Sequence, residues 1–169
     1  SPALYLGRYI VRETKAPDGM IMDTEPKEVE LKYAGQDIEL TEISCSFFNE
    51  RCKIKLSLKK ELEKSNRYDV GGAEQYKNVQ FALYAAEDIF AADGSYIPKD
   101  GLIEIAVSDG EGNIAFGADM PAGTKCYVME YFTDKHYQIS DIVYPVTFDF
   151  GESTDKEVGI TVNSGEKIK

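Results

Sequence analysis

Short runs of β-branched and aromatic residues, separated by turn-forming residues, restrict the fold of this chain more than any other feature. Gly, Pro, Asp or Asn bound each run, and these residues close strands and form turns. The runs are Tyr9–Val11, Val29–Leu31, Ile43–Phe48, Ile54–Leu58, Val79–Tyr84, Ile103–Val107, Ile114–Phe116, Cys126–Met129 and Val143–Phe150. Helical signals are confined to short stretches at Lys59–Lys64 and Ala85–Ala92. Regularly spaced short strands predict an all-β sandwich or barrel.

Alternation along these runs predicts which side chains are buried. It is clearest in the stretch from Ile54 to Lys59, where Ile54, Leu56 and Leu58 fall on the same face of a strand. The same reasoning identifies core positions in the later runs. We expect the following side chains to be mainly buried: Phe81, Leu83, Ile103, Phe116, Val128 and Phe148.

The charge balance narrows the classes of partner. The chain has 30 acidic and 19 basic residues and a formal net charge of −11, which would repel a phosphate backbone or an anionic membrane surface. No apolar run approaches the ~20 residues that a membrane span needs. We therefore expect no nucleic-acid partner and no membrane contact within this chain.

Cysteine, histidine and acidic residues give no metal-site or catalytic pattern. Cys45, Cys52 and Cys126 have no metal-like spacing, and the apolar runs around Cys45 and Cys126 predict buried free thiols. His136 is the single histidine and has no triad-like neighbours. The stretch Asp109–Asn113 lacks the ligand spacing of a calcium loop and predicts a hairpin turn. We expect no metal, no cofactor and no enzymatic turnover.

An internal repeat indicates how the chain is organised. Tyr9–Glu13 aligns with Cys126–Glu130, and at the same offset Val29–Leu31 aligns with Val146–Phe148. Two separated blocks that share an offset predict two copies of one structural unit. Residues 1–51 are then the rear part of one repeat, which lacks its front strands, and residues 52–169 are nearly all of the next.

Several stretches resemble B-type domains (Cna B-like, SpaA-like) of Gram-positive pilins and surface adhesins. Arg8–Gly19 resembles the E-box of this family, a strand that ends in Glu-Thr and is followed by Ala-Pro-x-Gly. Further similar segments are Asn78–Tyr84, Ser108–Phe116, Met120–Thr124 and Phe48–Arg51. In the second copy, Glu130 is retained but Ala-Pro-x-Gly is lost. The resemblance implies a prealbumin-like, inverse immunoglobulin-type β-sandwich.

The resemblance also implies a possible intramolecular isopeptide bond between a first-strand lysine and a last-strand asparagine, assisted by the E-box glutamate. Burial favours the neutral forms of an amine and of a carboxyl. A neutral amine can attack the amide carbonyl, while the carboxyl polarises that carbonyl and transfers protons as ammonia leaves. Such a reaction is autocatalytic, needs a folded core and requires no cofactor.

In the second copy, Lys60 is the expected amine and Glu130 the assisting carboxyl. Lys60 continues the inward row of the strand that begins at Ile54, although a shift of one residue would substitute Lys59. Glu130 occupies the E-box position by the repeat alignment.

The asparagine acceptors are assigned differently in the two copies. In the first, Glu13 is the E-box carboxyl and Asn49 its expected partner. In the second, the position equivalent to Asn49 is Glu166, which has no amide, so the remaining choice is Asn163 or a residue beyond Lys169. Because Asn163 precedes Ser164-Gly165, its local sequence also favours a turn.

The function that the resemblance implies is structural. The chain would be a stalk segment of an extracellular, cell-wall-attached adhesin or pilin, with its anchor outside this sequence. Its partners would be neighbouring domains of the same surface protein. The alternative is a ligand-binding module that recognises a host protein or glycan through inter-strand loops such as Ile89–Gly101.

Overall fold

The computed structural model describes residues 4–37, 41–91, 93–149 and 157–165. These residues divide into two units, residues 4–52 and residues 53–149 with 157–165. Strands dominate both units, and the only helix among the described residues is the short α1 (Ala73–Tyr76). The expected all-β fold is confirmed. No helix in the described ranges is long and apolar enough to cross a membrane.

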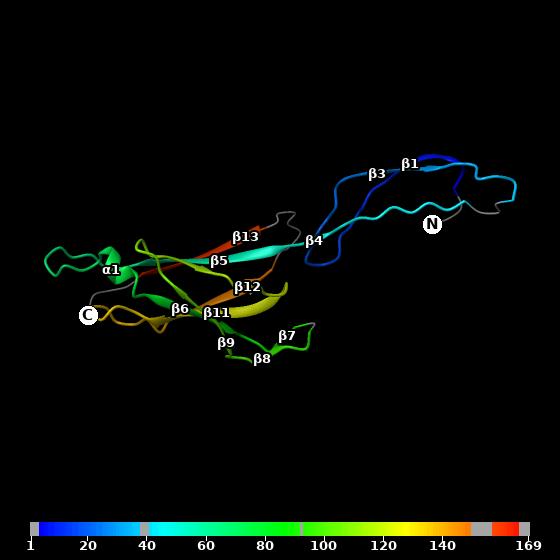
Figure 1. Ribbon diagram of the computed structural model, residues 1–169. Coiled ribbons are helices and arrows are strands. Elements are labelled where there is room, and N and C mark those ends of the chain that lie inside the picture. The colour runs from blue at the N-terminus through cyan, green and yellow to red at the C-terminus, as the bar shows by residue number, and fades with distance from the viewer. Residues whose placement is uncertain (1–3, 38–40, 92, 150–156, 166–169) are drawn as a thin grey trace. The chain divides into compact units, whose positions relative to one another are not determined.

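The second unit is a sandwich of two sheets (Figure 1). The three-stranded sheet has the order β10–β5–β13, formed by Asn113–Phe116, Lys53–Glu61 and Glu157–Gly165. The four-stranded sheet has the order β12–β11–β6–β9, formed by Val143–Phe148, Thr124–Phe132, Gln80–Ala85 and Leu102–Val107. A separate hairpin joins β7 (Ile89–Phe90) to β8 (Tyr96–Ile97).

The first and last strands of this unit, β5 and β13, lie side by side and run parallel. Their register extends from Lys53 opposite Glu157 to Glu61 opposite Gly165. On its other side β5 pairs antiparallel with β10. The central strand of the sheet is therefore the first strand of the unit.

Alternating side chains of the two sheets fill the space between them. The expected core residues Phe81, Leu83, Phe116, Val128 and Phe148 are buried. Ile103 is only partly buried, because it lies where the register of β9 against β6 shifts, between Leu102 and Glu104. The sandwich core is thus the one that alternation in the sequence predicts.

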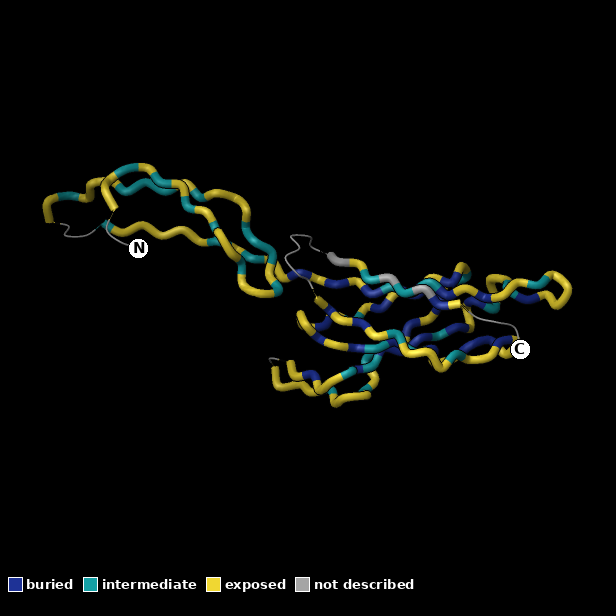
Figure 2. Tube along the Cα trace, turned by 180° about the vertical axis from the view of Figure 1, so that it is seen from behind, coloured by how far each residue is buried: buried dark blue, intermediate teal, exposed yellow. Residues whose placement is uncertain are grey.

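The first unit consists of two strand pairs. β1 (Gly7–Val11) pairs with β3 (Lys27–Leu31), and β2 (Met20–Ile21) pairs with β4 (Glu50–Arg51). None of the described residues from 4 to 51 is buried, as Figure 2 shows by the absence of the buried colour there. This unit therefore lacks a hydrophobic core within the residues described.

The strand pairs of the two units share one register. Gly7 pairs with Leu31 in the first unit, and Thr124 pairs with Phe148 in the second, a displacement of 117 positions for both partners. The remaining β1–β3 pairs repeat in β11–β12 at the same displacement. The repeat read from the sequence therefore corresponds to equivalent strand pairing.

Three expectations about local structure are wrong. Ile43–Phe48 forms no strand, Lys59–Lys64 begins within β5 rather than in a helix, and Ala85–Ala92 contains the end of β6 and then β7 in its described residues. Tertiary context overrides local propensity in each case. The two segments expected to be helical pair with other strands, whereas Ile43–Phe48 has strand propensity but pairs with no strand.

Three further expectations also need correction. β12 ends at Phe148, so the run predicted to reach Phe150 stops earlier, and residue 150 lies outside the described ranges. The turn Asp109–Asn113 connects β9 to β10, which belong to different sheets, so it closes no hairpin. Cys45 is exposed rather than buried, because the segment around it joins no sheet.

Candidate cross-link sites

Lys60 is the last inward-facing residue of β5. It continues the row of Ile54, Leu56 and Leu58, all of which are buried, and it is itself 0% exposed. An isolated charge in such a place is very costly, so a buried lysine needs a close polar partner. Because side chains alternate along β5, the Lys60 amine points into the apolar core.

Glu130 on β11 is that partner. The distance between Lys60 Nζ and Glu130 Oε1 is 3.0 Å, and both side chains are 0% exposed. The amine also lies over the ring of Phe81, 5.6 Å from its centroid. The two side chains come from opposite sheets, so their contact joins the two layers of the sandwich.

The second carboxylate oxygen of Glu130 has its own donor. The backbone N–H of Ser140 donates to Glu130 Oε2 over 2.7 Å. Glu130 lies opposite Phe81 of β6, and the register of β11 against β6 shifts directly after this pair. The carboxylate is therefore held between a buried amine and the backbone of the segment that leads into β12.

The register of β13 decides which residue faces Lys60. Ser164 pairs with Lys60, whereas Asn163 pairs with Lys59. Ser164 is buried, and the hydroxyl of Tyr144 donates to its Oγ over 3.0 Å. Asn163 belongs to β13, so the turn that its local sequence favoured is wrong, and its register does not match Lys60.

Lys59, the alternative amine, lies on the other face of β5. Its Nζ donates to the backbone oxygen of Glu111 over 2.6 Å and to Asn113 Oδ1 over 2.9 Å. Glu111 lies in the turn before β10, and Asn113 is the first residue of β10. Lys59 therefore does not approach Glu130.

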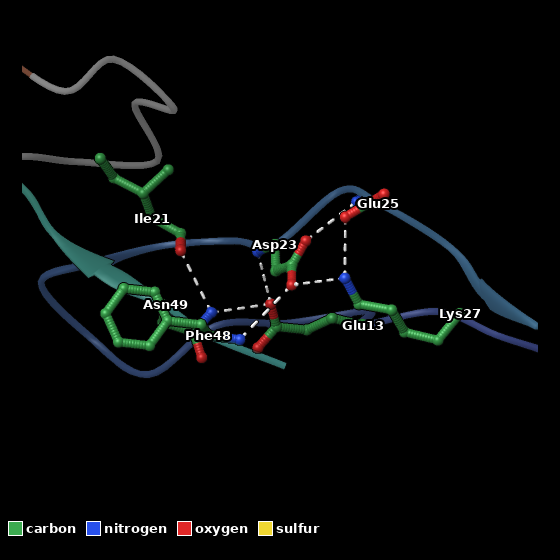
Figure 3. A network of polar contacts seen from close by, with 7 residues as sticks. All are labelled: Glu13, Ile21, Asp23, Glu25, Lys27, Phe48 and Asn49. Atoms are coloured by element: carbon green, nitrogen blue, oxygen red, sulfur yellow. Dashed lines mark hydrogen bonds and ion pairs between the residues drawn. The ribbon is translucent and has the colours of Figure 1, made fainter. Parts of the chain in front are cut away.

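The first unit holds the other expected pair. The amide of Asn49 donates through Nδ2 to Glu13 Oε2 over 2.7 Å and to the backbone oxygen of Ile21 over 3.1 Å (Figure 3). The backbone N–H of Asp23 donates to the same Glu13 oxygen over 2.7 Å. The amide of Asn49 is thus oriented with its nitrogen against the E-box carboxylate.

Asp23 extends this network to the surrounding segments. Its carboxylate accepts from the backbone N–H of Glu25 over 3.0 Å and lies 3.5 Å from Lys27 Nζ (Figure 3). The pKa of Asp23 is lowered, mainly by the hydrogen bond from the backbone of Glu25. The backbone N–H of Phe48, next to Asn49, also donates to Asp23 over 3.4 Å.

The two glutamates share one backbone contact. Each accepts a hydrogen bond from the backbone N–H ten residues later, Asp23 for Glu13 and Ser140 for Glu130, at 2.7 Å in both cases. Within the described residues, the first unit combines the carboxyl with an asparagine and the second combines it with a lysine.

Sequence reasoning missed Ser164, Asp23 and Tyr144. The ten-residue spacing after each E-box glutamate is the signal that could have identified Asp23.

Other chemistry finds little support among the described residues. No group of three or more His, Cys, Asp or Glu side chains there could hold a metal ion. Asp109 accepts from the backbone of Glu111 and Asn113 in its turn, as a turn-stabilising aspartate does. His136 Nδ1 lies 2.5 Å from Asp134 Oδ1 at a half-exposed position.

Comparison with known families and structures supports the resemblance. Residues 1–44 match the family described as SpaA, prealbumin-like fold domain. Comparison with curated protein sequences finds no match. The family match confirms the resemblance of the first unit to SpaA-like domains. It depends on the sequence and not on the strand geometry described above.

Several solved structures align with this chain, one of them with a TM-score above 0.5. The TIE protein of Bacillus anthracis aligns with 98% of this chain at 20% identity and a TM-score of 0.59, over 26% of its own length. A C-terminal fragment of the pilus adhesin SpaC from Lactobacillus rhamnosus GG aligns with 99% of this chain and 78% of its own, at 14% identity and a TM-score of 0.49. The major pilin SpaA of Corynebacterium diphtheriae aligns with 68% of this chain and 30% of its own, at 19% identity and a TM-score of 0.44. The chain thus spans about a quarter of the length of the TIE protein, and the likeness concerns the fold.

Proposed function

We propose that this chain is a load-bearing segment of a bacterial surface stalk, extracellular and attached to the cell wall through parts of the protein outside this sequence. The parallel pairing of β5 with β13 carries the proposal. Tension along the chain pulls β5 at its Lys53 end and β13 at its Gly165 end, which are opposite ends of the same ladder. The ladder is then loaded in shear, so its hydrogen bonds resist together rather than one after another.

Force spectroscopy tests this role. Pulling between residues 53 and 165 should unfold the second unit in a single high-force event. Pulling between residues 53 and 157, which form a pair at the same end of the ladder, should open the strands bond by bond at clearly lower force. Equal forces in the two directions would contradict a load-bearing ladder.

The cross-link belongs to the same proposal, with different assignments in the two units. For the first unit, we propose Glu13 as assisting carboxyl and Asn49 as acceptor, with the lysine supplied by a strand that precedes this sequence. The short contact between the Asn49 amide and Glu13 supports this assignment. For the second unit, we propose that Lys60 and Glu130 occupy the positions of the amine and the assisting carboxyl, with no asparagine in register opposite Lys60.

The register of β13 does not place an asparagine opposite Lys60 in the second unit. Asn163 is the sequence candidate, but the residue in register with Lys60 is Ser164, which has no amide to exchange. In this chain we therefore expect Lys60 to remain an amine. Its ion pair with Glu130 would then hold the two sheets without a covalent bond.

Intact mass measurement tests these assignments. The unmodified chain should have its full sequence mass. A Ser164→Asn variant should lose ~17 Da, one ammonia, as Lys60 Nζ forms a bond to the new side-chain carbonyl carbon and the C–NH₂ bond breaks. The added substitution Lys60→Ala should abolish that loss. A loss of ~17 Da in the unmodified chain, abolished by Lys60→Ala, would instead assign Asn163 as acceptor.

The alternative function, ligand binding through a loop, has one supporting observation. The β7–β8 hairpin exposes Phe90 and Tyr96, whose ring centroids are 4.9 Å apart. An aromatic pair at a hairpin is suited to contact a host protein or glycan. If binding to host matrix or glycan arrays is detected and a Phe90→Ala/Tyr96→Ala variant loses it, this function is supported. Unchanged binding by the variant would exclude this hairpin.

A further inference from the structure

The β7–β8 hairpin turns two aromatic side chains toward solvent. Phe90 of β7 lies directly opposite Tyr96 of β8, so the two rings share one face of the hairpin. The neighbouring pair, Ile89 opposite Ile97, occupies the other face and packs against the sandwich core. Because side chains alternate along each strand, the face that carries the rings points away from the core. Phe90 and Tyr96 are accordingly 72% and 51% exposed.

Hydrogen bonds within the hairpin hold these rings in place. The backbone N–H of Ala91 donates to the backbone oxygen of Ser95 over 2.9 Å, and that of Gly94 donates to Ala91 over 3.0 Å. The backbone N–H of Ser95 also donates to the Asp93 carboxylate over 2.9 Å. A ring pair on such a support loses little conformational freedom when a partner packs on it.

A small hollow lies beside Phe90. Its volume is about 180 Å³, and it is lined by residues 87–90, which include β7, and by residues 121–124, which lead into β11. We call it the hairpin hollow. Gly123 keeps it open, since an added Cβ there would meet nothing within 4 Å. Small-molecule sites usually measure ~300–1,000 Å³, so the hairpin hollow is better suited to a single side chain of a protein partner.

Two carboxylates line the hairpin hollow, and both can accept further hydrogen bonds. Glu87 Oε2 lies 3.3 Å from Lys125 Nζ, in an exposed ion pair of the weak kind that exchanges readily. Asp88 Oδ1 accepts from the backbone N–H of Lys99 over 2.8 Å, and the Tyr96 hydroxyl also donates to Asp88. A carboxylate offers about four acceptor positions, so each retains capacity for a donor from a partner.

The charges around the hairpin favour a cationic partner. Between residues 86 and 101 the acidic side chains are Glu87, Asp88, Asp93 and Asp100, and the single basic one is Lys99. An acidic excess remains when Lys125 is counted with them. The net charge of the whole chain, −11, acts in the same direction. An acidic peptide or glycan would be repelled here, whereas a cation would be attracted.

We propose that Phe90, Tyr96 and the hairpin hollow bind an arginine side chain of a partner protein. The proposal rests on the alternative function of this hairpin as a binding loop and names the chemistry of its ligand; it does not depend on the cross-link. A guanidinium group is planar, so it can stack on an exposed ring while its N–H groups donate to Glu87 and Asp88. A lysine ammonium has no planar face and should bind less tightly.

Chemical-shift titration of the full ¹⁵N-labelled chain tests the proposal. The probe is the peptide acetyl-Gly-Ser-Arg-Ser-Gly-amide, at concentrations up to ~20 mM because one side chain supports only about millimolar affinity. The comparison peptides carry lysine or citrulline instead of arginine, and citrulline keeps the shape of arginine without its charge. We expect the arginine peptide to shift the backbone amides of Asp88, Phe90, Ser95 and Gly123. Citrulline should bind roughly 10-fold more weakly, because it loses both the stacking of a cation and the ionic contacts.

The outcomes separate this inference from the binding function itself. Equal affinities for arginine and citrulline would leave the hairpin as a binding loop but overturn its selection of a cation. A lysine peptide that binds as tightly as the arginine peptide would overturn the assignment to arginine. If no peptide shifts these amides, the inference fails, and the matrix and glycan arrays decide separately whether the hairpin binds another ligand.

Matched variants locate the contact. Glu87→Gln and Phe90→Leu should each weaken binding of the arginine peptide roughly 2- to 5-fold. Lys125→Gln should strengthen it by a similar factor, because it removes a like charge and frees Glu87. Glu111→Gln and Phe132→Leu change an exposed acid and an exposed ring elsewhere on the second unit and should have little effect. Weaker binding by Lys125→Gln, or an equal loss in Phe132→Leu and Phe90→Leu, would overturn the proposal, and thermal melts would verify that each variant is folded.

Discussion

At the scale of single residues, the contact between Lys60 and Glu130 is the least usual feature of the second unit. Removing both charges from water is expensive, and the 3.0 Å ion pair with the backbone donor from Ser140 offsets part of that cost. Neither partner is tolerated well in this core without the other. The pair is therefore better suited to fixing the register of β5 against β11 than to adding net stability.

Replacing Lys60 alone should be strongly destabilising. In Lys60→Met the Glu130 carboxyl remains buried without its cation, and loss of one partner of a buried pair typically costs roughly 3–5 kcal/mol. The double variant Lys60→Met/Glu130→Leu should recover most of that loss. Urea denaturation of the two variants measures both values. A single variant as stable as the double would show that the pair is not coupled in this way.

The three cysteines should differ sharply in reactivity. Cys45 is exposed, whereas Cys52 and Cys126 are buried. Burial raises the pKa of the Cys126 thiol to about 11, so the reactive thiolate is scarce at pH 8. Iodoacetamide at pH 8 should add one label per folded chain and three after unfolding in urea, as read by mass spectrometry. Labelling of Cys126 in the folded chain would contradict its burial.

At the scale of elements, the turn between β9 and β10 connects the two sheets and is built tightly against β5. The backbone N–H of Lys60 donates to the oxygen of Gly112 over 2.8 Å, and Asp109 accepts from the backbone of Glu111 and Asn113. The pKa of Asp109 is lowered, mainly by the hydrogen bond from the Asn113 side chain. This turn therefore helps to hold Lys60 at its place at the end of the inward row.

Gly112→Ala should test how tightly that turn is packed. Gly112 has φ = +89°, and an added Cβ would lie 2.3 Å from the Lys60 backbone oxygen, so strain and collision act together. Gly94→Ala is the matched control, with φ = +86° and nothing within 4 Å of the added Cβ. Strain alone costs roughly 1–3 kcal/mol, so Gly112→Ala should lower the free energy of unfolding by clearly more than Gly94→Ala. Equal losses in thermal melts would show that the turn can shift aside.

At the scale of the whole molecule, the two units differ in self-sufficiency. The second has a continuous core between its sheets, whereas the first has no buried residue among those described from 4 to 51. Exposed apolar side chains, including Ile10 and Phe48, remain on the first unit. We interpret this, as the repeat predicts, as the rear part of a sandwich without its front strands.

Separate expression of the two parts should reproduce this difference. Residues 52–169 should melt in a single cooperative transition, because their core is enclosed by both sheets. Residues 1–51 alone should show no cooperative melt, since two strand pairs without a core cannot balance the entropy of ordering. Circular dichroism against temperature measures both. A cooperative transition in residues 1–51 would refute the incomplete-repeat interpretation.

The sequence by itself determined the all-β class and the inward row of β5, and it predicted a two-copy organisation. These depend on period-two alternation, turn residues and a constant offset, all of which are local or self-comparing properties of the chain. It also indicated Lys60 and Glu130 as candidates. What it could not decide was the residue opposite Lys60, because the register of β13 against β5 joins positions about 100 apart in the sequence.

Only the tertiary structure settled that Ser164, not Asn163, pairs with Lys60, and that Cys45 is exposed. A shift of one residue exchanges the two faces of a strand, and nothing in the local sequence around Asn163 distinguishes the two registers.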